Sequence, residues 1–268
     1  MANLQINQLP TITGNTLLET DVIPVQTSTG TKSIAVEELL QEVLLQNRDL
    51  INKCNVLNAR LAAKETYDHV IINQYYGGGT KEDTGSVSHA FIELYNPTNE
   101  TVSLTGKSIQ YVKDTTVAKL DLSGEIPSKH SFLIRCKLTN SGTSTQPALS
   151  LTDKTADMEW DQYIANKGIS ILLMKNTDLV SVDSSLSENQ NVIDVIGSSG
   201  DAQEAVKFFE GEVVVDQSKQ KSVRRILFSD TNNNKADCEI VDFRLKGNLA
   251  KAPKCKADGA WGINNVVN

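Results

Sequence analysis

The side chains best suited to hold a metal gather in the stretch "DTNNNKAD", which runs from Asp230 to Asp237. Oxygen-bearing side chains at alternate positions are also how the first three ligands of a calcium loop are arranged. The stretch is not an EF-hand, because Lys235 stands at the sixth position, where that loop needs glycine, and Val241 at the twelfth, where it needs glutamate. We therefore favour a turn whose Asx side chains bond their own backbone and a nearby arginine. The alternative is a calcium site with the ligands Asp230, Asn232, Asn234 and Asp237.

Two adjacent arginines and three histidines are the other polar groups of interest. Arg224 and Arg225 fall in a predicted strand, where neighbouring side chains point to opposite faces. We expect one arginine to pair inside the fold and the other to be solvated. His69, His89 and His130 lie in or beside predicted strands, and none has a Cys, Asp or Glu at a metal-ligand spacing. We interpret the histidines as surface or hydrogen-bonded strand residues.

No catalytic motif is visible in the sequence. The glycines of "YYGGGT" do not open a helix after a strand, so they indicate a turn rather than a phosphate cradle. There is no GxSxG motif and no Ser/His/Asp ordering. The sequence therefore gives no support for an enzyme and predicts no cofactor.

The four cysteines are widely separated and form no CxxC pair, which fits neither a zinc site nor a disulfide framework. We expect reduced thiols, with a disulfide between Cys238 and Cys255 as the alternative.

Length and charge narrow the class of protein. The chain has 268 residues, enough for one large domain or two small ones. Its 33 acidic and 26 basic residues give a net charge of −7, which argues against a general nucleic-acid binder and against binding to an anionic membrane surface. No stretch approaches the ~18 apolar residues of a spanning helix, so we expect no membrane insertion. The start, "MANLQINQLPTITGNT", lacks the basic and apolar regions of a signal peptide.

A coiled-coil helix is predicted after a polar N-terminal arm. Apolar residues recur at spacings of four and three, and neither Gly nor Pro interrupts them. So narrow a seam suits a coiled coil better than a helix packed on its own domain, which is the alternative. An amide at an a position fixes register and favours a dimer, whereas valine at d positions favours higher states, so dimer and trimer both remain open. The seam consists of Val36, Leu40, Val43, Asn47, Leu50, Cys54, Leu57 and Leu61.

The remainder of the chain is dense in strand patterns separated by Gly, Asn, Pro and Ser clusters, which indicates an all-β sandwich. In "FIELY" the alternation places Phe91, Glu93 and Tyr95 on one face and Ile92 and Leu94 on the other. The expected strands are "HVIINQYY", "AFIELY", "SIQYV", "SFLIRC", "ISILLM", "NVIDVI", "SVRRILF" and "EIVDF".

Several of these pieces resemble the lamin tail domain, an immunoglobulin-like β-sandwich. "VIINQYYGGG" resembles its opening strand and glycine loop, and "FIELYNPTNETVSLTGKSIQYV" resembles its signature block. "LSGEIPSKHSFLIRC" resembles the next hairpin, and "VIDVIG", "SVRRI" and "DTNNNKADCEIVDF" resemble the closing motifs. Lys107 and Cys238 depart from the family pattern, which often has Trp and Phe there. The resemblance implies the sandwich fold.

The N-terminal stretch "INQLPTITGNTLLETDVIPVQTSTGTKSIAVEELLQ" is similar to the attachment arms of head-fibre and tail-fibre proteins of tailed bacteriophages. Such arms often precede a short coiled coil. The resemblance implies a capsid-docking surface formed by Leu4, Ile6, Leu9, Pro10, Val22, Ile23 and Pro24.

Together these patterns predict a mainly β protein in which an extended arm and one long coiled-coil helix precede an immunoglobulin-like sandwich. The expected role is a homo-oligomeric head fibre on the virion surface, assembled in the host cytoplasm. It would dock on the capsid or another virion protein and display its sandwiches to a host-surface glycan or protein. The alternatives are a tail or baseplate fibre and a non-viral bacterial binding or adhesion module. The expected parts are a docking arm (1–33), a helix (34–64), the sandwich (65–248) and a C-terminal tail (249–268).

Overall fold

The structure is a computed structural model that describes residues 22–27, 30–35, 47, 68–79 and 84–261. The chain divides into two compact units, Met1–Ala59 and Arg60–Asn268. No helix in the described ranges is long and apolar enough to cross a membrane.

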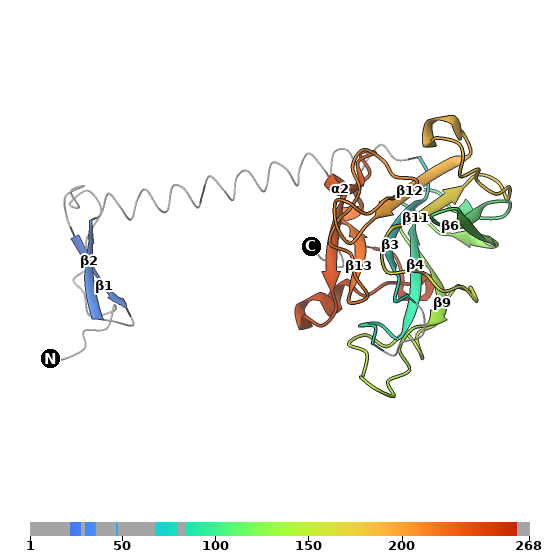
Figure 1. Cartoon of the computed structure of the whole chain (residues 1–268). Coiled ribbons are helices and arrows are strands. Elements are labelled where there is room, and N and C mark those ends of the chain that lie inside the picture. Colours follow the sequence, from blue (N-terminus) through green and yellow to red (C-terminus); the bar gives the residue numbers. More distant parts are fainter. Residues whose placement is uncertain (1–21, 28–29, 36–46, 48–67, 80–83, 262–268) are drawn as a thin grey trace. The chain divides into compact units, whose positions relative to one another are not determined.

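A β-hairpin forms in the N-terminal unit (Figure 1). Strand β1 (Val22–Thr27) pairs antiparallel with β2 (Gly30–Ala35), and Thr27 faces Gly30. The stretch predicted as an extended arm therefore contains a hairpin in these residues, and β2 runs beyond the expected end of the arm at residue 33. The reason is that two short segments rich in β-branched residues satisfy each other's backbone groups on either side of "TSTG".

Only part of the predicted docking and coiled-coil surfaces lies in the described residues. Val22, Ile23 and Pro24 belong to β1, where a proline is tolerated because both strands of a two-stranded sheet are edges. Asn47 is helical and exposed. The remaining positions of both surfaces lie outside the described residues, so the long helix and the docking arm stay predictions: Leu4, Ile6, Leu9, Pro10, Val36, Leu40, Val43, Leu50, Cys54, Leu57 and Leu61.

The second unit is built on two sheets that form a β-sandwich (Figure 1). The larger sheet has the order β10-β9-β4-β3-β13-β14, with β10 (Met158–Glu159), β9 (Ser131–Leu138), β4 (His89–Tyr95), β3 (Ile71–Tyr76), β13 (Lys221–Arg225) and β14 (Cys238–Asp242). The smaller sheet has the order β12-β11-β6-β7, with β12 (Val192–Ser198), β11 (Ile169–Met174), β6 (Ser108–Lys113) and β7 (Thr116–Asp121). Strands β5 (Val102–Ser103) and β8 (Glu125–Ile126) pair with each other.

The main core lies between the two sheets, and β4 shows how the sequence builds it. Ile92 and Leu94 point into this core with residues such as Ile171 of β11. Phe91 and Tyr95 point to the opposite face and join two smaller apolar clusters there. The alternation predicted for "FIELY" is therefore confirmed, but both faces of the strand are buried rather than one.

All eight expected strands are present, and the differences from the expected pattern have local causes. Strand β13 ends at Arg225, where "SVRRILF" was expected to continue, because Leu227 and Phe228 adopt positive φ angles of 51° and 60° in the 3-10 turn η3 (Ile226–Phe228). Strand β7 was missed, since its sequence "TVAKLD" is only partly buried and has no clear apolar alternation.

The C-terminal segment covers the outer face of the larger sheet through η4 (Lys246–Lys251) and η5 (Lys256–Asp258). Trp261 is only 7% exposed, donates its indole N–H to Ser131 Oγ at 2.8 Å and packs edge-on against Phe228. The predicted tail thus docks back on its own sandwich as far as Trp261. Cys255 is buried against this face as a free thiol, and Cys136 and Cys238 are free as well, so the alternative of a Cys238–Cys255 disulfide is wrong.

Replacing Trp261 with alanine should lower the free energy of unfolding by about 3–5 kcal/mol, because it removes a buried ring from the outer face of the sheet. Urea unfolding followed by circular dichroism measures this loss. Leu245→Ala is the control, because Leu245 is 61% exposed in the same segment and its truncation should change stability by less than about 0.5 kcal/mol. Equal effects of the two substitutions would contradict the packing of Trp261.

Candidate functional site

A buried arginine organises the most polar part of the sandwich interior. Arg225 is the last residue of β13, and its side chain is 0% exposed. Its Nη2 lies 2.6 Å from Asp194 Oδ1 on β12, and its Nε donates to the carbonyl of Ile72 on β3 at 3.0 Å. The other oxygen of Asp194 accepts the Ile72 N–H at 2.5 Å. The ion pair therefore joins the smaller sheet to the larger one, with the β3 backbone bonded to both charges.

The stretch singled out in the sequence wraps around the same guanidinium. Nη1 of Arg225 donates to the Ser229 carbonyl at 2.7 Å and lies 3.3 Å from Asp230 Oδ1 and 3.6 Å from Asp237 Oδ2. Asp237 also accepts hydrogen bonds from Ser229 Oγ and from the N–H and hydroxyl of Thr231. The contacts are those of the Asx-rich turn with a nearby arginine.

The two asparagines that were the other candidate calcium ligands differ in their surroundings. Asn234 Nδ2 donates to Glu210 Oε2 at 3.4 Å. Asn234 begins the short helix α2 (Asn234–Asp237), is buried, and donates to the Val195 carbonyl at 2.8 Å. Its Oδ1 accepts the N–H groups of Gly197 and Glu210 at 2.9 and 3.1 Å. Asn232 is exposed, with a φ of 56°. Of the four candidates, the structure brings Asp230 and Asp237 together at Arg225 and assigns Asn234 to a backbone-bonding role.

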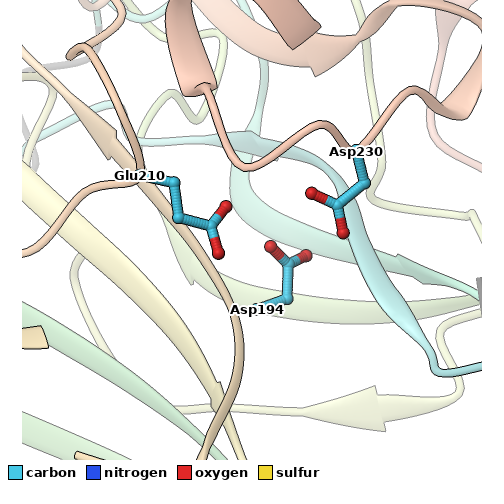
Figure 2. A group of neighbouring side chains, drawn as sticks. All are labelled: Asp194, Glu210 and Asp230. Atoms are coloured by element: carbon cyan, nitrogen blue, oxygen red, sulfur yellow. The ribbon is translucent and has the colours of Figure 1, made fainter. Parts of the chain in front are cut away.

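A fourth carboxylate, Glu210, reaches the cluster from a loop that follows β12. This approach depends on Gly197, because a Cβ there would lie 2.5 Å from the Phe208 carbonyl oxygen. Figure 2 shows the carboxylates of Asp194, Glu210 and Asp230 pointing toward one another, and their oxygens lie within 4.8 Å of one another. Oxygen donors in such a group are the ligands that hard divalent cations prefer.

Burial and crowding shift the proton affinities of these groups. Burial, with the nearby charges of Asp194 and Asp230, raises the pKa of Glu210 to about 9. Burial would also raise the pKa of Asp230, but the hydrogen bond from His69 and the charge of Arg225 outweigh it and lower that pKa. His69 Nε2 lies 3.4 Å from Asp230 Oδ2, and this contact raises the pKa of the imidazole. At neutral pH Glu210 therefore retains its proton, while Asp230 stays ionised between the side chains of His69 and Arg225.

The cluster works as an ionic clamp inside the sandwich. Its centre already holds a fixed cation, because the Arg225 guanidinium contacts Asp194, Asp230 and Asp237. The arrangement fastens β12, β3 and the turn after η3 to one side chain, which is a structural task. The three acidic side chains of Figure 2 are the residues that could also present oxygens to a metal.

Sequence reasoning missed three members of this cluster and one feature of the arginine pair. Asp194 gave a usable signal, a lone acid inside the apolar run "VIDVIG", whereas Glu210 and His69 gave none. Arg224, expected to be solvated if Arg225 was inside, is buried and lies 3.2 Å from Glu239. The expectation failed because the C-terminal segment covers the outer face on which Arg224 lies.

A groove of about 480 Å³ lies elsewhere, along the edge formed by β9 and β10. Arg135 of β9 forms a bidentate pair with Glu159 of β10, at 3.2 and 2.7 Å. Lys137 Nζ lies 3.2 Å from Asp161 Oδ1 and 4.8 Å from the centre of the Tyr163 ring. The groove therefore combines two ion pairs with an aromatic ring on one surface.

Comparison with known proteins gives a family for this fold. The Lamin Tail Domain family matches residues 63–200, just over half of the chain. The chain belongs to the lamin tail domain family. A DUF4876 family protein from Bacteroides thetaiotaomicron VPI-5482 is similar in structure, with a TM-score of 0.41 and 12% identity over 63% of this chain and 70% of that chain. A search of the curated proteins found no match.

The two sites lie differently within the lamin tail domain. The residues that form the groove fall inside the matched stretch, as do Asp194 and His69. Glu210, Arg225 and Asp230 follow it in the sequence, so the clamp joins the matched stretch of the lamin tail domain to the strands that close its larger sheet.

Replacing Glu210 with glutamine should raise the free energy of unfolding of the lamin tail domain, and this gain over the wild type should grow as the pH rises. The folded-state pKa lies above the ordinary value of 4.5, so the wild-type carboxyl destabilises the fold progressively between pH 4.5 and 9, by up to about 1.4 kcal/mol per pH unit. Urea unfolding at pH 5 and pH 8 should show a gain that is small at pH 5 and large at pH 8. Glu212→Gln is the control, because Glu212 is exposed and paired with Lys235. A gain from Glu210→Gln that does not change with pH would contradict a protonated carboxyl at Glu210.

Breaking the clamp should be costly in a way that depends on both charges. Arg225→Met should lower the free energy of unfolding by about 3–5 kcal/mol, because it leaves Asp194 buried without a cation. Adding Asp194→Leu should recover part of that loss, which a double-mutant cycle in urea measures. Arg244→Met is the matched control, since Arg244 forms an equally short but exposed pair with Asp242 at 2.6 Å, and it should change stability little. No recovery in the double variant would mean that packing, not charge, explains the cost.

Proposed function

We propose that this protein is a homo-oligomeric fibre of a tailed bacteriophage, a head fibre that displays lamin tail domains at the virion surface. Its N-terminal arm docks on the capsid or on another virion protein. The helix after the arm joins two or three copies, and each sandwich contacts a host-surface glycan or protein. Assembly takes place in the host cytoplasm.

The observation that carries this proposal is the division of the chain into a small N-terminal unit, Met1–Ala59, and a separate β-sandwich unit. The small unit contains the β1–β2 hairpin inside the stretch that resembles fibre attachment arms. Asn47 is helical and exposed, so this a-position amide is available to a second chain. A small unit with strands of its own and a separate sandwich unit suit a protein that attaches through one unit and displays the other.

A binding role also agrees with how the polar groups of the sandwich are used. Ser88 Oγ lies 2.9 Å from His89 Nδ1, a contact that a hydrolase could use. Ser88 is nevertheless buried, and its Oγ accepts the Leu151 N–H at 2.8 Å, so it anchors a loop. The clamp around Arg225 is likewise committed to joining strands. We therefore propose a protein that is not an enzyme and uses no cofactor.

Two other assignments make different predictions. A tail or baseplate fibre would share the oligomer and differ in its docking partner. A non-viral lamin tail adhesion module would keep its binding activity and its oligomeric state when the first 65 residues are removed.

Light scattering coupled to size exclusion should give the mass of a dimer or trimer for the full chain and of a monomer for a chain that begins at Thr66. The reason is that a lone helix of this length gains little in water, so its seam needs a partner. Asn47→Val should broaden the distribution of oligomers, because it removes the amide that would fix the register between the associated helices. Asn55→Val makes the same change outside the predicted seam and should leave the mass unchanged. A monomeric full chain would contradict the fibre.

A further inference from the structure

We propose that the groove along β9 and β10 binds a neutral oligosaccharide. The inference rests on the proposed surface-attachment role and names the ligand class of the sandwich. Four features of the groove support it: the spacing of its side chains, its balanced charge, its aromatic and imidazole lining, and the paired backbone of β9 beneath it.

The spacing of the side chains produces a ladder along the groove. Glu159, Asp161 and Tyr163 are alternate residues of the segment that runs beside β9, and all three line the groove. The segment includes a tight turn in which the Gln162 N–H donates to the Trp160 carbonyl at 2.7 Å. Arg135 and Lys137 are alternate residues of β9 and face them, since β10 pairs with β9 in parallel with Glu159 opposite Arg135. A ligand that lies along the groove would meet two successive ion pairs, Arg135–Glu159 and Lys137–Asp161, and then the ring of Tyr163.

The charges of the ladder balance. Arg135 is occupied by Glu159 and by the carbonyls of Leu151, Thr152 and Lys154. The two acids remain open to solvent, because the Glu159 side chain is 60% and the Asp161 side chain 89% exposed. A surface of exposed carboxylates whose cations are already paired offers hydrogen-bond acceptors without a net charge. Such a surface suits neutral hydroxyl groups and gives no advantage to an anionic ligand.

The remaining lining supplies an apolar floor and a neutral polar group. Trp160 and the half-buried Tyr163 line the groove, and aromatic rings offer a flat apolar face together with a polar edge. His89 also lines it, and burial, with the charge of Arg135, lowers the pKa of its imidazole. A neutral imidazole has one donor and one acceptor nitrogen, and because Nδ1 contacts Ser88 Oγ at 2.9 Å, Nε2 is the nitrogen that the ring can offer to a ligand.

A peptide strand cannot pair with β9 in the groove, because the backbone of β9 is already bonded there to residues 160–162. The Trp160 N–H donates to the Arg135 carbonyl at 2.9 Å, and the Lys137 N–H donates to the Gln162 carbonyl at 3.1 Å. Addition of a strand needs open backbone groups. Side chains, rather than backbone, are what this surface offers a ligand.

The test is binding of the full chain to an array of oligosaccharides. The array carries neutral homopolymers of glucose, galactose, mannose and N-acetylglucosamine beside sialylated and sulfated chains. We expect binding to at least one neutral series. Binding restricted to anionic chains, or no binding, would overturn the proposal.

Two variants locate the site on the hit that the array gives. Tyr163→Ala removes the ring and Asp161→Ala removes an exposed acceptor, and each should weaken binding by about tenfold or more in calorimetry. Phe209→Ala and Asp121→Ala are the controls, since Phe209 is 37% exposed and Asp121 pairs with Lys119 on β7, away from the groove lining. Circular dichroism verifies that all four variants are folded. Full affinity in both groove variants would place the ligand elsewhere and overturn the proposal.

The outcome separates this proposal from the fibre. An oligomeric full chain that binds no neutral glycan would refute the groove and leave the fibre intact. A monomeric chain whose glycan binding depends on Tyr163 would support the groove and refute the fibre.

Discussion

The ion pair between Arg225 and Asp194 is the interaction on which the sandwich depends most. Both side chains are fully buried, and they belong to different sheets. Removing two charges from water is expensive, and the attraction between them compensates only when their other hydrogen-bonding groups are satisfied. Here Ile72 contributes its carbonyl to the arginine and its N–H to the aspartate, so one residue of β3 completes both partners. The pair thereby fixes how the two sheets lie against each other.

The sequence predicted well whatever depends on local alternation. Strand β11 has the bounds expected from "ISILLM", and β4 has the expected faces, because burial imposes a period of two on any strand. It predicted poorly what depends on distant partners. Nothing near Glu210 indicates that Asp194 and Asp230 will surround it, and the solvated arginine was expected because the tail that covers Arg224 lies beyond β14.

The two candidate sites also differ in how much of each could be predicted from the sequence. The "DTNNNKAD" stretch was found because its residue types are unusual, and the arginine contact was expected, but its centre was not visible without the fold. The groove was missed because its members are ordinary charged residues and become a ladder only when residues 159–163 lie beside β9. The hairpin of β1 and β2 was missed because the polar stretch around Gly30 was expected to be an extended arm, although glycine is also a residue of turns.

The protonated carboxyl of Glu210 has a thermodynamic consequence beyond stability. A group that holds its proton in the folded chain and loses it in the unfolded chain makes unfolding a proton-releasing reaction at neutral pH. The buffer takes up that proton, so the heat absorbed on unfolding includes the enthalpy of protonating the buffer. The same protein would therefore show different calorimetric enthalpies in phosphate and in Tris, and the difference would count the protons released.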